Sequence, residues 1–352
     1  MSRRGWVLFA LMSVIWGMPY LFIKVADGGV SVPVLVFTRL AVAAALLLPL
    51  AIRRRQIAGL WRHWRWLVVF AIVEMIIPWA LLSDAERHLS SSMTGLLVAS
   101  VPIIGVVLAR ATGGTERLTV IRWAGLLIGL AGVAVLAGRD ALGGDAWSVA
   151  EVVLVAVCYA TGPLIVNRKL SELPGLGVNA FCLSFAAIVY APAAALTWPA
   201  AVPSAQVLAS LAALGIICTA LAFVLFFKLI AEVGPARAVV ITYVNPAVAV
   251  ALGVAVLGEP LTLEIVAAFV LILAGSALAT RPSEPRRPPR PGASLRHRAG
   301  LPGGKESARE PADEPADEAA ARVPHEGPRP ASTGAAARHL ARSAPPDEER
   351  AT

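Results

Sequence analysis

The sequence predicts an all-α integral membrane protein, and three observations lead to this fold class. Hydrophobic residues make up 57% of the 352-residue chain and charged residues only 15%, with a mean hydropathy of +0.71. The apolar residues form uninterrupted blocks, whereas a soluble protein would distribute them at helix or strand period around a core. The basic residues gather in alternate short loops between these blocks. Together these features predict a chain of membrane-spanning helices.

Ten segments are long enough to cross a bilayer, because about 30 Å of hydrocarbon requires about 20 apolar residues of helix. The first follows Arg3 and Arg4, and its apolar run is long enough that we interpret it as a retained helix and not as a signal peptide. The predicted spans are residues 5–25, 32–52, 66–85, 92–110, 119–138, 147–167, 177–198, 207–228, 236–256 and 262–280.

Lysine and arginine in the loops predict the orientation, since the cytoplasmic loops of membrane proteins are the basic ones. The opposite loops contain only Arg87 and Arg139. We therefore expect a multi-pass protein of the cell (inner) membrane with both termini in the cytoplasm. This asymmetry and a basic tail account for the net charge of +8 without nucleic-acid binding. The basic residues on the predicted cytoplasmic side are Arg3, Arg4, Arg53, Arg54, Arg55, Arg62, Arg65, Arg110, Arg117, Arg168, Lys169, Lys228 and Arg237.

The chain also resembles itself at an offset of 143 residues, which superposes Trp16 on Tyr159 and Glu116 on Glu259. Each of these glutamates is followed two residues later by Leu-Thr. Each unit holds five predicted spans, an odd number, so the second copy must cross the membrane in the opposite sense. The expected architecture is ten transmembrane helices in two inverted five-helix repeats, with a binding site near the bilayer midplane between the halves.

The domain organisation follows from this repeat and from a change of composition at residue 281. We predict a first five-helix repeat over residues 1–142, a second over 143–280, and a disordered cytoplasmic tail over 281–352. The tail is rich in Pro, Arg, Ala and Glu, and such a segment cannot bury enough apolar surface to offset its ordering entropy.

Three motifs give the chain a specific resemblance: Trp16-Gly17, Tyr243-Val-Asn-Pro246 and Leu257-Gly-Glu-Pro-Leu-Thr262. With them, residues 5–280 resemble the EamA family, a ten-helix branch of the drug/metabolite transporter (DMT) superfamily. The resemblance implies a secondary transporter, usually an exporter of metabolites, amino acids or toxic compounds. It implies no particular substrate. The first-half motif, Gly114-Thr-Glu-Arg-Leu-Thr119, lacks the Leu-Gly before its glutamate, so substrate and coupling mode stay open.

Two charges lie deep in predicted spans, where insertion costs about 2.5 to 3.5 kcal/mol and demands a partner, a water-filled cavity or a function. Glu74, in the middle of the third span, is a candidate proton-coupling group; the alternative is a neutral glutamic acid hydrogen-bonded between helices. Arg39, in the second span, is either the counter-charge of Glu74 or the binding group for an anionic substrate. Snorkelling to the interface is a further alternative for Arg39.

Prolines interrupt many spans, and the backbone carbonyls that they free are tolerated at depth only against protein or water. A cavity between the halves is the simplest account. Aromatic walls with few hydrogen-bonding groups would suit an amphipathic organic solute, although aromatic belts at the membrane interface are an alternative. The predicted substrate-binding residues are Trp16, Tyr20, Arg39, Glu74, Trp79, Tyr159, Tyr243 and Asn245.

The glutamates of the repeated motif are expected to be structural. Glu116 and Glu259 are predicted in the first turn of the fifth and tenth helices, where a carboxylate can cap free amides and meet the helix dipole. Pro260 is tolerated at such a helix start. Gly125-x-x-x-Gly129 with Gly132 predicts close helix packing, with a partner in the same chain or in a second protomer.

The sequence predicts no enzyme, no cofactor and no metal site. All five histidines lie in loops or the tail, the three cysteines lie within apolar blocks, and no nucleotide-binding Gly-x-x-x-x-Gly-Lys motif occurs. The predicted partners are a small-molecule substrate and the lipid bilayer, with alternating access and possible proton coupling; the sequence leaves the oligomeric state open. A lipid flippase, a channel and, less favoured, a membrane sensor are the alternative functions.

Overall fold

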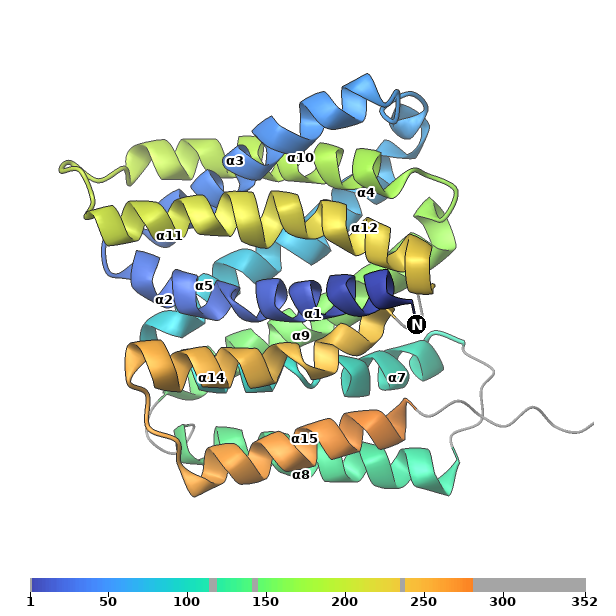
Figure 1. Ribbon diagram of the computed structural model, residues 1–352, viewed down its shortest axis with the longest axis vertical. Helices are drawn as coiled ribbons and strands as arrows, with labels where there is room; N and C mark the ends of the chain where they lie inside the picture. Colours follow the sequence, from blue (N-terminus) through green and yellow to red (C-terminus); the bar gives the residue numbers. More distant parts are fainter. Residues whose placement is uncertain (1, 114–118, 141–144, 235–237, 281–352) are drawn as a thin grey trace, which may run out of the picture. The chain divides into compact units, whose positions relative to one another are not determined.

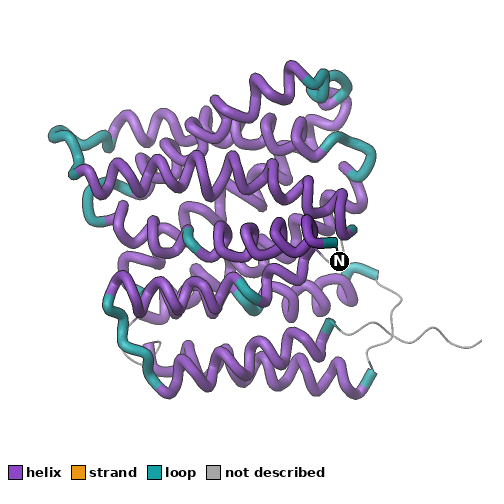
Figure 2. Tube along the Cα trace, in the orientation of Figure 1, coloured by secondary structure: helices purple, strands orange, loops and turns teal. Residues whose placement is uncertain are grey.

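The computed structural model describes residues 2–113, 119–140, 145–234 and 238–280, and helices make up nearly all of this part of the chain (Figures 1 and 2). No strand occurs within these residues. Glu116 and the predicted tail over residues 281–352 lie outside them. The elements of the first 140 residues are α1 (Arg3–Gly17), α2 (Pro19–Asp27), α3 (Val32–Arg53), η1 (Leu60–His63), α4 (Trp64–Ala71), η2 (Ile72–Ile76), α5 (Ile77–His88), α6 (Ser91–Val98), α7 (Val101–Ala111) and α8 (Val120–Asp140).

The remaining described residues continue the same pattern of apolar helices joined by short loops. Their elements are α9 (Ala146–Ile165), η4 (Val166–Leu170), α10 (Gly175–Leu196), α11 (Ala205–Gly215), η5 (Ile216–Leu221), α12 (Ala222–Val233), η6 (Val239–Tyr243), α14 (Asn245–Leu257) and α15 (Leu263–Ala279).

Eight helical stretches of the described chain are long and apolar enough to cross a membrane. Two shorter apolar helices, Val120–Val135 and Leu263–Ala279, coincide with the predicted fifth and tenth spans. The all-helical membrane fold is therefore confirmed, while the count of ten spans stays a prediction. The third stretch is longer than predicted: it runs over Leu60–His88 and so places Glu86 and Arg87 within the helix.

Several stretches are broken or widened in the middle. Residue Met18 separates α1 from α2 just before Pro19, and Ala99 and Ser100 separate α6 from α7 just before Pro102. The elements η2, η4 and η5 are π-helical. Pro78, two residues after η2, has no N–H to donate to the carbonyl of Glu74, which favours the wider turn there.

Glycines set the closest helix contact, between α8 and α15, which lie side by side in Figure 1. A Cβ atom built on Gly275 would lie 2.3 Å from the backbone nitrogen of Gly129, and one built on Gly125 would lie 2.5 Å from the nitrogen of Ala279. Only a residue without a Cβ atom allows this approach. The predicted close packing is confirmed, and the partner helix belongs to the same chain.

Helices from the first half of the chain pack mainly on helices from the second half. The contacting pairs include α3 with α10, α1 with α12, α5 with α9 and α6 with α14. The largest buried apolar cluster accordingly draws Leu35, Leu40 and Met75 from the first half and Leu183 and Leu214 from the second. Polar side chains in the middle of the bundle therefore lie between the two halves.

Candidate functional site

Arg39 lies about a third of the way along α3 and is buried, with 7% of its surface exposed. Its guanidinium carbon lies 3.8 Å from the ring centre of Trp79 in α5, a cation–π arrangement. Its Nε donates to Thr219 Oγ1 at 3.0 Å. The Thr219 hydroxyl donates in turn to the Leu214 carbonyl, five residues back in the widened turn around η5, at 2.8 Å. Side chains from two other stretches, at α5 and η5, thus hold the guanidinium group in place.

Glu74 lies in η2 and faces α9, which belongs to the second half of the chain. A Cβ atom built on Gly162 would lie 1.9 Å from Glu74 Oε2, so the carboxyl group rests directly against the Gly162 backbone. Glu74 Oε2 is buried without a hydrogen-bond partner. A buried carboxyl oxygen without a donor disfavours the ionised form, because the charge would be neither solvated nor paired.

Glu74 and Arg39 do not form the ion pair that the sequence suggested. Among the described residues, a salt bridge joins Arg87 and Asp27. The Arg39 guanidinium group instead stacks on Trp79 and donates to Thr219. The reason is geometric, since the two side chains turn to different neighbours. Tyr159 on α9 interacts electrostatically with both Arg39 and Glu74.

The other predicted binding residues divide into two sets. Tyr20 is buried and interacts electrostatically with Tyr159 and Arg39, so we group Tyr20, Arg39, Glu74, Trp79 and Tyr159 as the central cluster. The predicted residues Trp16, Tyr243 and Asn245 have other surroundings.

These three residues tie helices to one another. Trp16 packs on Phe223 and Phe226 of α12. The Tyr243 hydroxyl lies 2.6 Å from Thr280 Oγ1, and the Asn245 amide nitrogen donates to the Ser13 carbonyl of α1 at 3.1 Å. Their present contacts are those of packing residues.

Two cavities of the described chain are lined by residues other than the predicted binding residues. An apolar cavity of about 280 Å³ lies between α14 and α15. A more polar one of about 260 Å³ is lined by residues that include His63, Arg168 and Glu172.

Glu259 does not cap its own helix, which corrects the prediction for it and for Pro260. Helix α15 begins at Leu263, with Thr262 as its N-cap, so Glu259 and Pro260 lie in the preceding loop. Glu259 instead accepts hydrogen bonds from the backbone N–H groups of Ser91 (2.7 Å) and Ser92 (3.0 Å), which open α6. The Ser92 hydroxyl also donates to Glu259. Glu116, its counterpart in the first half, lies outside the described residues.

The reason is the path of the chain after α14. Gly258 adopts a left-handed conformation (φ 68°), and the N–H of Glu259 donates to the Gly253 carbonyl, so the chain turns back before α15 begins. Burial raises the pKa of the Glu259 carboxyl group, but the bonds from Ser92 and Ser91 lower it more, and its pKa lies below its usual value.

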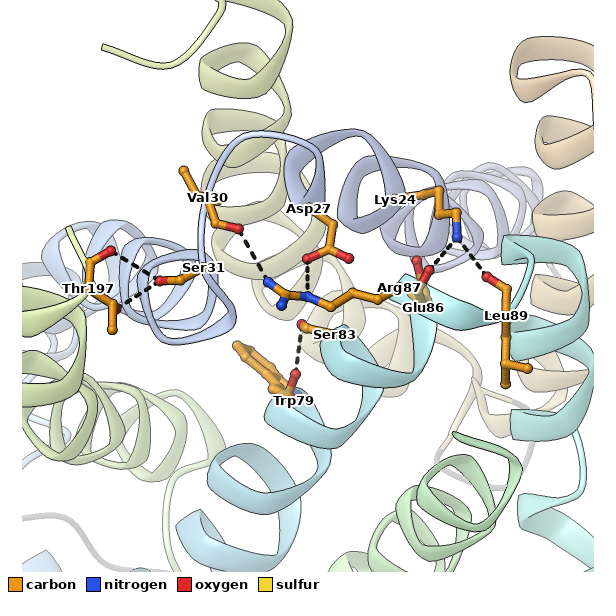
Figure 3. A network of polar contacts seen from close by, with 10 residues as sticks. All are labelled: Lys24, Asp27, Val30, Ser31, Trp79, Ser83, Glu86, Arg87, Leu89 and Thr197. Carbon is orange, nitrogen blue, oxygen red and sulfur yellow. Dashed lines mark hydrogen bonds and ion pairs between the residues drawn. The ribbon is translucent and has the colours of Figure 1, made fainter. Parts of the chain in front are cut away.

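Figure 3 shows further polar contacts where α2 meets the end of α5, just before the start of α6. Lys24 Nζ donates to the backbone carbonyls of Glu86 and Leu89, the latter at 2.8 Å. Arg87 Nε donates to Asp27 Oδ1 at 2.9 Å. We call this group of contacts the end network. It consists of the side chains of Lys24, Asp27, Arg87 and Glu259 and the backbone of residues 86–92.

Some of these residues were not predicted as functional from the sequence. Thr219 is one of the few polar residues in an apolar span, and its polarity was the available signal. The run Ser90-Ser91-Ser92 at the start of a predicted span was a second signal, since serine favours helix starts. Both oxygens of the buried Glu86 carboxyl group are without a hydrogen-bond partner.

This helical membrane fold, with paired halves and charged groups between them, is typical of secondary transporters. The model of the EamA-like transporter family matches the chain twice, over residues 3–138 and 146–281. The chain belongs to the EamA-like transporter family, and it is a membrane transporter of the drug/metabolite type that acts on small molecules. This confirms the predicted family, and the name of one relative given below suggests efflux.

The chain is similar to several transporters. It is 28% identical over 272 residues to "Uncharacterized inner membrane transporter YedA" of Escherichia coli K12, covering 76% of this chain and 87% of the relative. It is 29% identical over 269 residues to "Probable terminal-alkyne amino-acid exporter" of Streptantibioticus cattleyicolor, covering 74% and 87%. A solved crystal structure matches with a TM-score of 0.57 and 22% identity over 80% of this chain and 97% of that one, which supports the fold alone.

Proposed function

We propose that the protein is a secondary active exporter of small organic solutes, such as metabolites, amino acids or drug-like compounds. In this proposal residues 1–142 and 143–280 are two inverted five-helix repeats that carry ten spans in all, and they rock against each other to expose a central site alternately to either side. The two separate family matches and the packing of first-half helices on second-half helices support it. The relative named as an amino-acid exporter supports the direction of transport.

We further propose that both termini lie in the cytoplasm of the cell (inner) membrane. The support is the concentration of Lys and Arg in alternate loops. The end network then belongs to the side facing away from the cytoplasm, because α1 starts on the cytoplasmic side and α2 ends at Asp27. Its bonds would have to open when the solute leaves on that side.

The observation that carries the coupling mechanism is the position of Glu74. Its Oε2 is buried without a donor, against a glycine of the opposite half. A carboxyl group in such a place exchanges a proton when the surroundings change, which happens when the halves separate. Proton uptake on one side and release on the other would drive solute export.

The test begins by identifying an exported compound, from metabolites in the medium of a deletion strain and an overexpressing strain. Glu74→Gln is then compared with the wild-type protein in proteoliposomes under an imposed pH gradient. We expect gradient-driven transport to fall to the level seen without a gradient, while counterflow exchange at equal pH remains. Glu172→Gln, which removes an exposed carboxyl group, is the control. Unchanged gradient-driven transport in Glu74→Gln would refute the proton role, and conductance without saturation would refute the carrier.

A further inference from the structure

Arg39 carries a charge that no ion pair within the described part of the chain neutralises; the Glu86 carboxyl group interacts with it electrostatically but lies beyond ion-pair distance. The guanidinium group stays protonated at any physiological pH, so burial cannot be relieved by losing the proton. No carboxylate among the described residues lies within ion-pair distance of it. The face of Trp79 and the Thr219 hydroxyl stabilise the guanidinium, but neither supplies a negative charge. A buried ion without a counter-ion is unfavourable, and this points to an anion that comes from outside.

The hydrogen-bonding capacity of Arg39 leads to the same conclusion. The bond to Thr219 uses only Nε, and a guanidinium group has four more N–H donors on its two terminal nitrogens. These two nitrogens form no hydrogen bond with a described residue. They are also not completely enclosed by other atoms. That edge of the group is therefore unsatisfied and still reachable.

The neighbours of Arg39 complete a possible site. Tyr20 and Tyr159 interact electrostatically with Arg39, and the Tyr159 hydroxyl also forms a hydrogen bond with the Trp79 side chain. Trp79 beneath the guanidinium and the apolar cluster around it offer aromatic and aliphatic surface. The donors thus converge from α2, α3 and α9, with an apolar wall beside them.

We propose that Arg39 binds the carboxylate of an organic monoanion, with Tyr20 and Tyr159 as additional hydroxyl donors. A carboxylate matches the planar fork of the guanidinium group with two parallel hydrogen bonds, and one negative charge balances one positive charge. A phosphate monoester would bring a second negative charge into the buried surroundings of Arg39, where one guanidinium group balances only one charge. This inference rests on the proposed transport function and specifies the substrate class of the same central cluster.

The experiment uses the wild-type protein in lipid nanodiscs and two pairs of a monoanionic acid with its neutral amide: 3-phenylpropionate with 3-phenylpropionamide, and 4-methylpentanoate with 4-methylpentanamide. The readout is the shift of the thermal unfolding midpoint during titration. We expect the acids to stabilise the protein and the amides not to. If amides stabilise as well as acids, or if no acid stabilises the protein, the proposal is overturned; this comparison needs no variant to fold.

Variants then locate the effect. Arg39→Gln should weaken the apparent affinity for the acids about 10- to 100-fold, the range for one charge-assisted pair. Arg39→Lys keeps a point charge but loses the fork, so it should lie between. Arg168→Gln, which removes an exposed arginine bonded to Thr112, is the matched control and should bind like the wild-type protein. Undiminished acid binding in Arg39→Gln would overturn the proposal.

Failure of this inference can be told apart from failure of the transport function. If the wild-type protein exports only solutes without a carboxylate, the exporter stands and the role of Arg39 falls. If acids bind through Arg39 but no solute crosses proteoliposome membranes, the site stands and the exporter falls. Stabilisation by a short-chain phosphatidylglycerol and not by the acids would assign the anion to a lipid head group and overturn the carboxylate.

Discussion

The end network and the central cluster are both places where charged side chains meet the helix bundle, but they are completed differently. In the end network Lys24, Asp27, Arg87 and Glu259 all have partners within the chain. In the central cluster Glu74 Oε2 has no partner, and Arg39 uses only one of its nitrogens. Polar groups that are satisfied hold a structure together, whereas unsatisfied ones mark where a proton or ligand binds.

Glu86 is the exception that tests this contrast. It is fully buried next to the end network, yet both of its carboxyl oxygens lack a hydrogen-bond partner. Its backbone carbonyl accepts from Lys24, so the ammonium group is held by the main chain near the carboxyl group. The end of the bundle therefore also contains a carboxyl group that resembles Glu74 in the centre.

Removing the cap of α6 should have the largest effect on stability. Glu259→Ala leaves the N–H groups of Ser91 and Ser92 without their acceptor and removes a charge at a helix N-terminus. We expect a loss of about 2 to 3 kcal/mol in the free energy of unfolding. Chemical denaturation in detergent measures it. Glu264→Ala, in the first turn of α15, is the comparison at another helix start. An equal loss of unfolding free energy in Glu264→Ala would show that the bonds from Glu259 to α6 contribute no more than a first-turn glutamate does.

Steric crowding of Glu74 in the central cluster should reduce transport more than it reduces stability. Gly162→Ala places a methyl group at the position of the Glu74 carboxyl group, which must move. We expect gradient-driven transport to fall about tenfold with little loss of folded protein, since alanine favours helix by about 1 kcal/mol over glycine. Transport in proteoliposomes and folded yield measure the two effects.

A second substitution provides the control for Gly162→Ala. Glu74→Asp shortens the side chain by one methylene group and should make room for the added methyl. The double variant is expected to transport better than Gly162→Ala alone. If it does not, the defect comes from the packing of α9 and not from the carboxyl group.

The contribution of Glu259 should depend on pH. Because the pKa of the Glu259 carboxyl group lies below its ordinary value in the folded protein, its stabilising effect is fully present above that ordinary pKa and is lost as the pH falls through the lower folded value. The difference in unfolding free energy between the wild-type protein and Glu259→Gln is thus expected to be about 1 kcal/mol at neutral pH and to shrink in acid. Denaturation over a pH series measures it, and a constant difference would contradict the charged cap.

The ion pair between Arg87 and Asp27 should matter least. The Arg87 side chain is 38% exposed, so solvent screens the pair and its coupling should be only about 0.5 kcal/mol. A double-mutant cycle with Arg87→Gln and Asp27→Asn gives this coupling directly. A coupling several times larger would mean that the end network is held by this pair and not by Glu259.

The sequence predicted the helical membrane fold, the family and the Gly125/Gly129 packing, because these follow from local composition and spacing. It did not predict that Glu259 caps α6, since the bond to Ser91 joins residues 168 positions apart and depends on how the halves meet. Arg39 was identified as a buried cation, but its stacking on Trp79 and its bond to Thr219 depend on side-chain geometry that no spacing encodes.

The widened turn at η5 links binding to helix shape. In the wide turn around η5 the Thr219 hydroxyl donates to the Leu214 carbonyl, five residues back, and presents its own lone pairs to Arg39. If this turn tightened into a regular α-helix, Thr219 would change its direction relative to Leu214 and the hydroxyl would lose this bond. The guanidinium group would then lose its anchor, so a local change of pitch in one helix would loosen the grip on an anion in another.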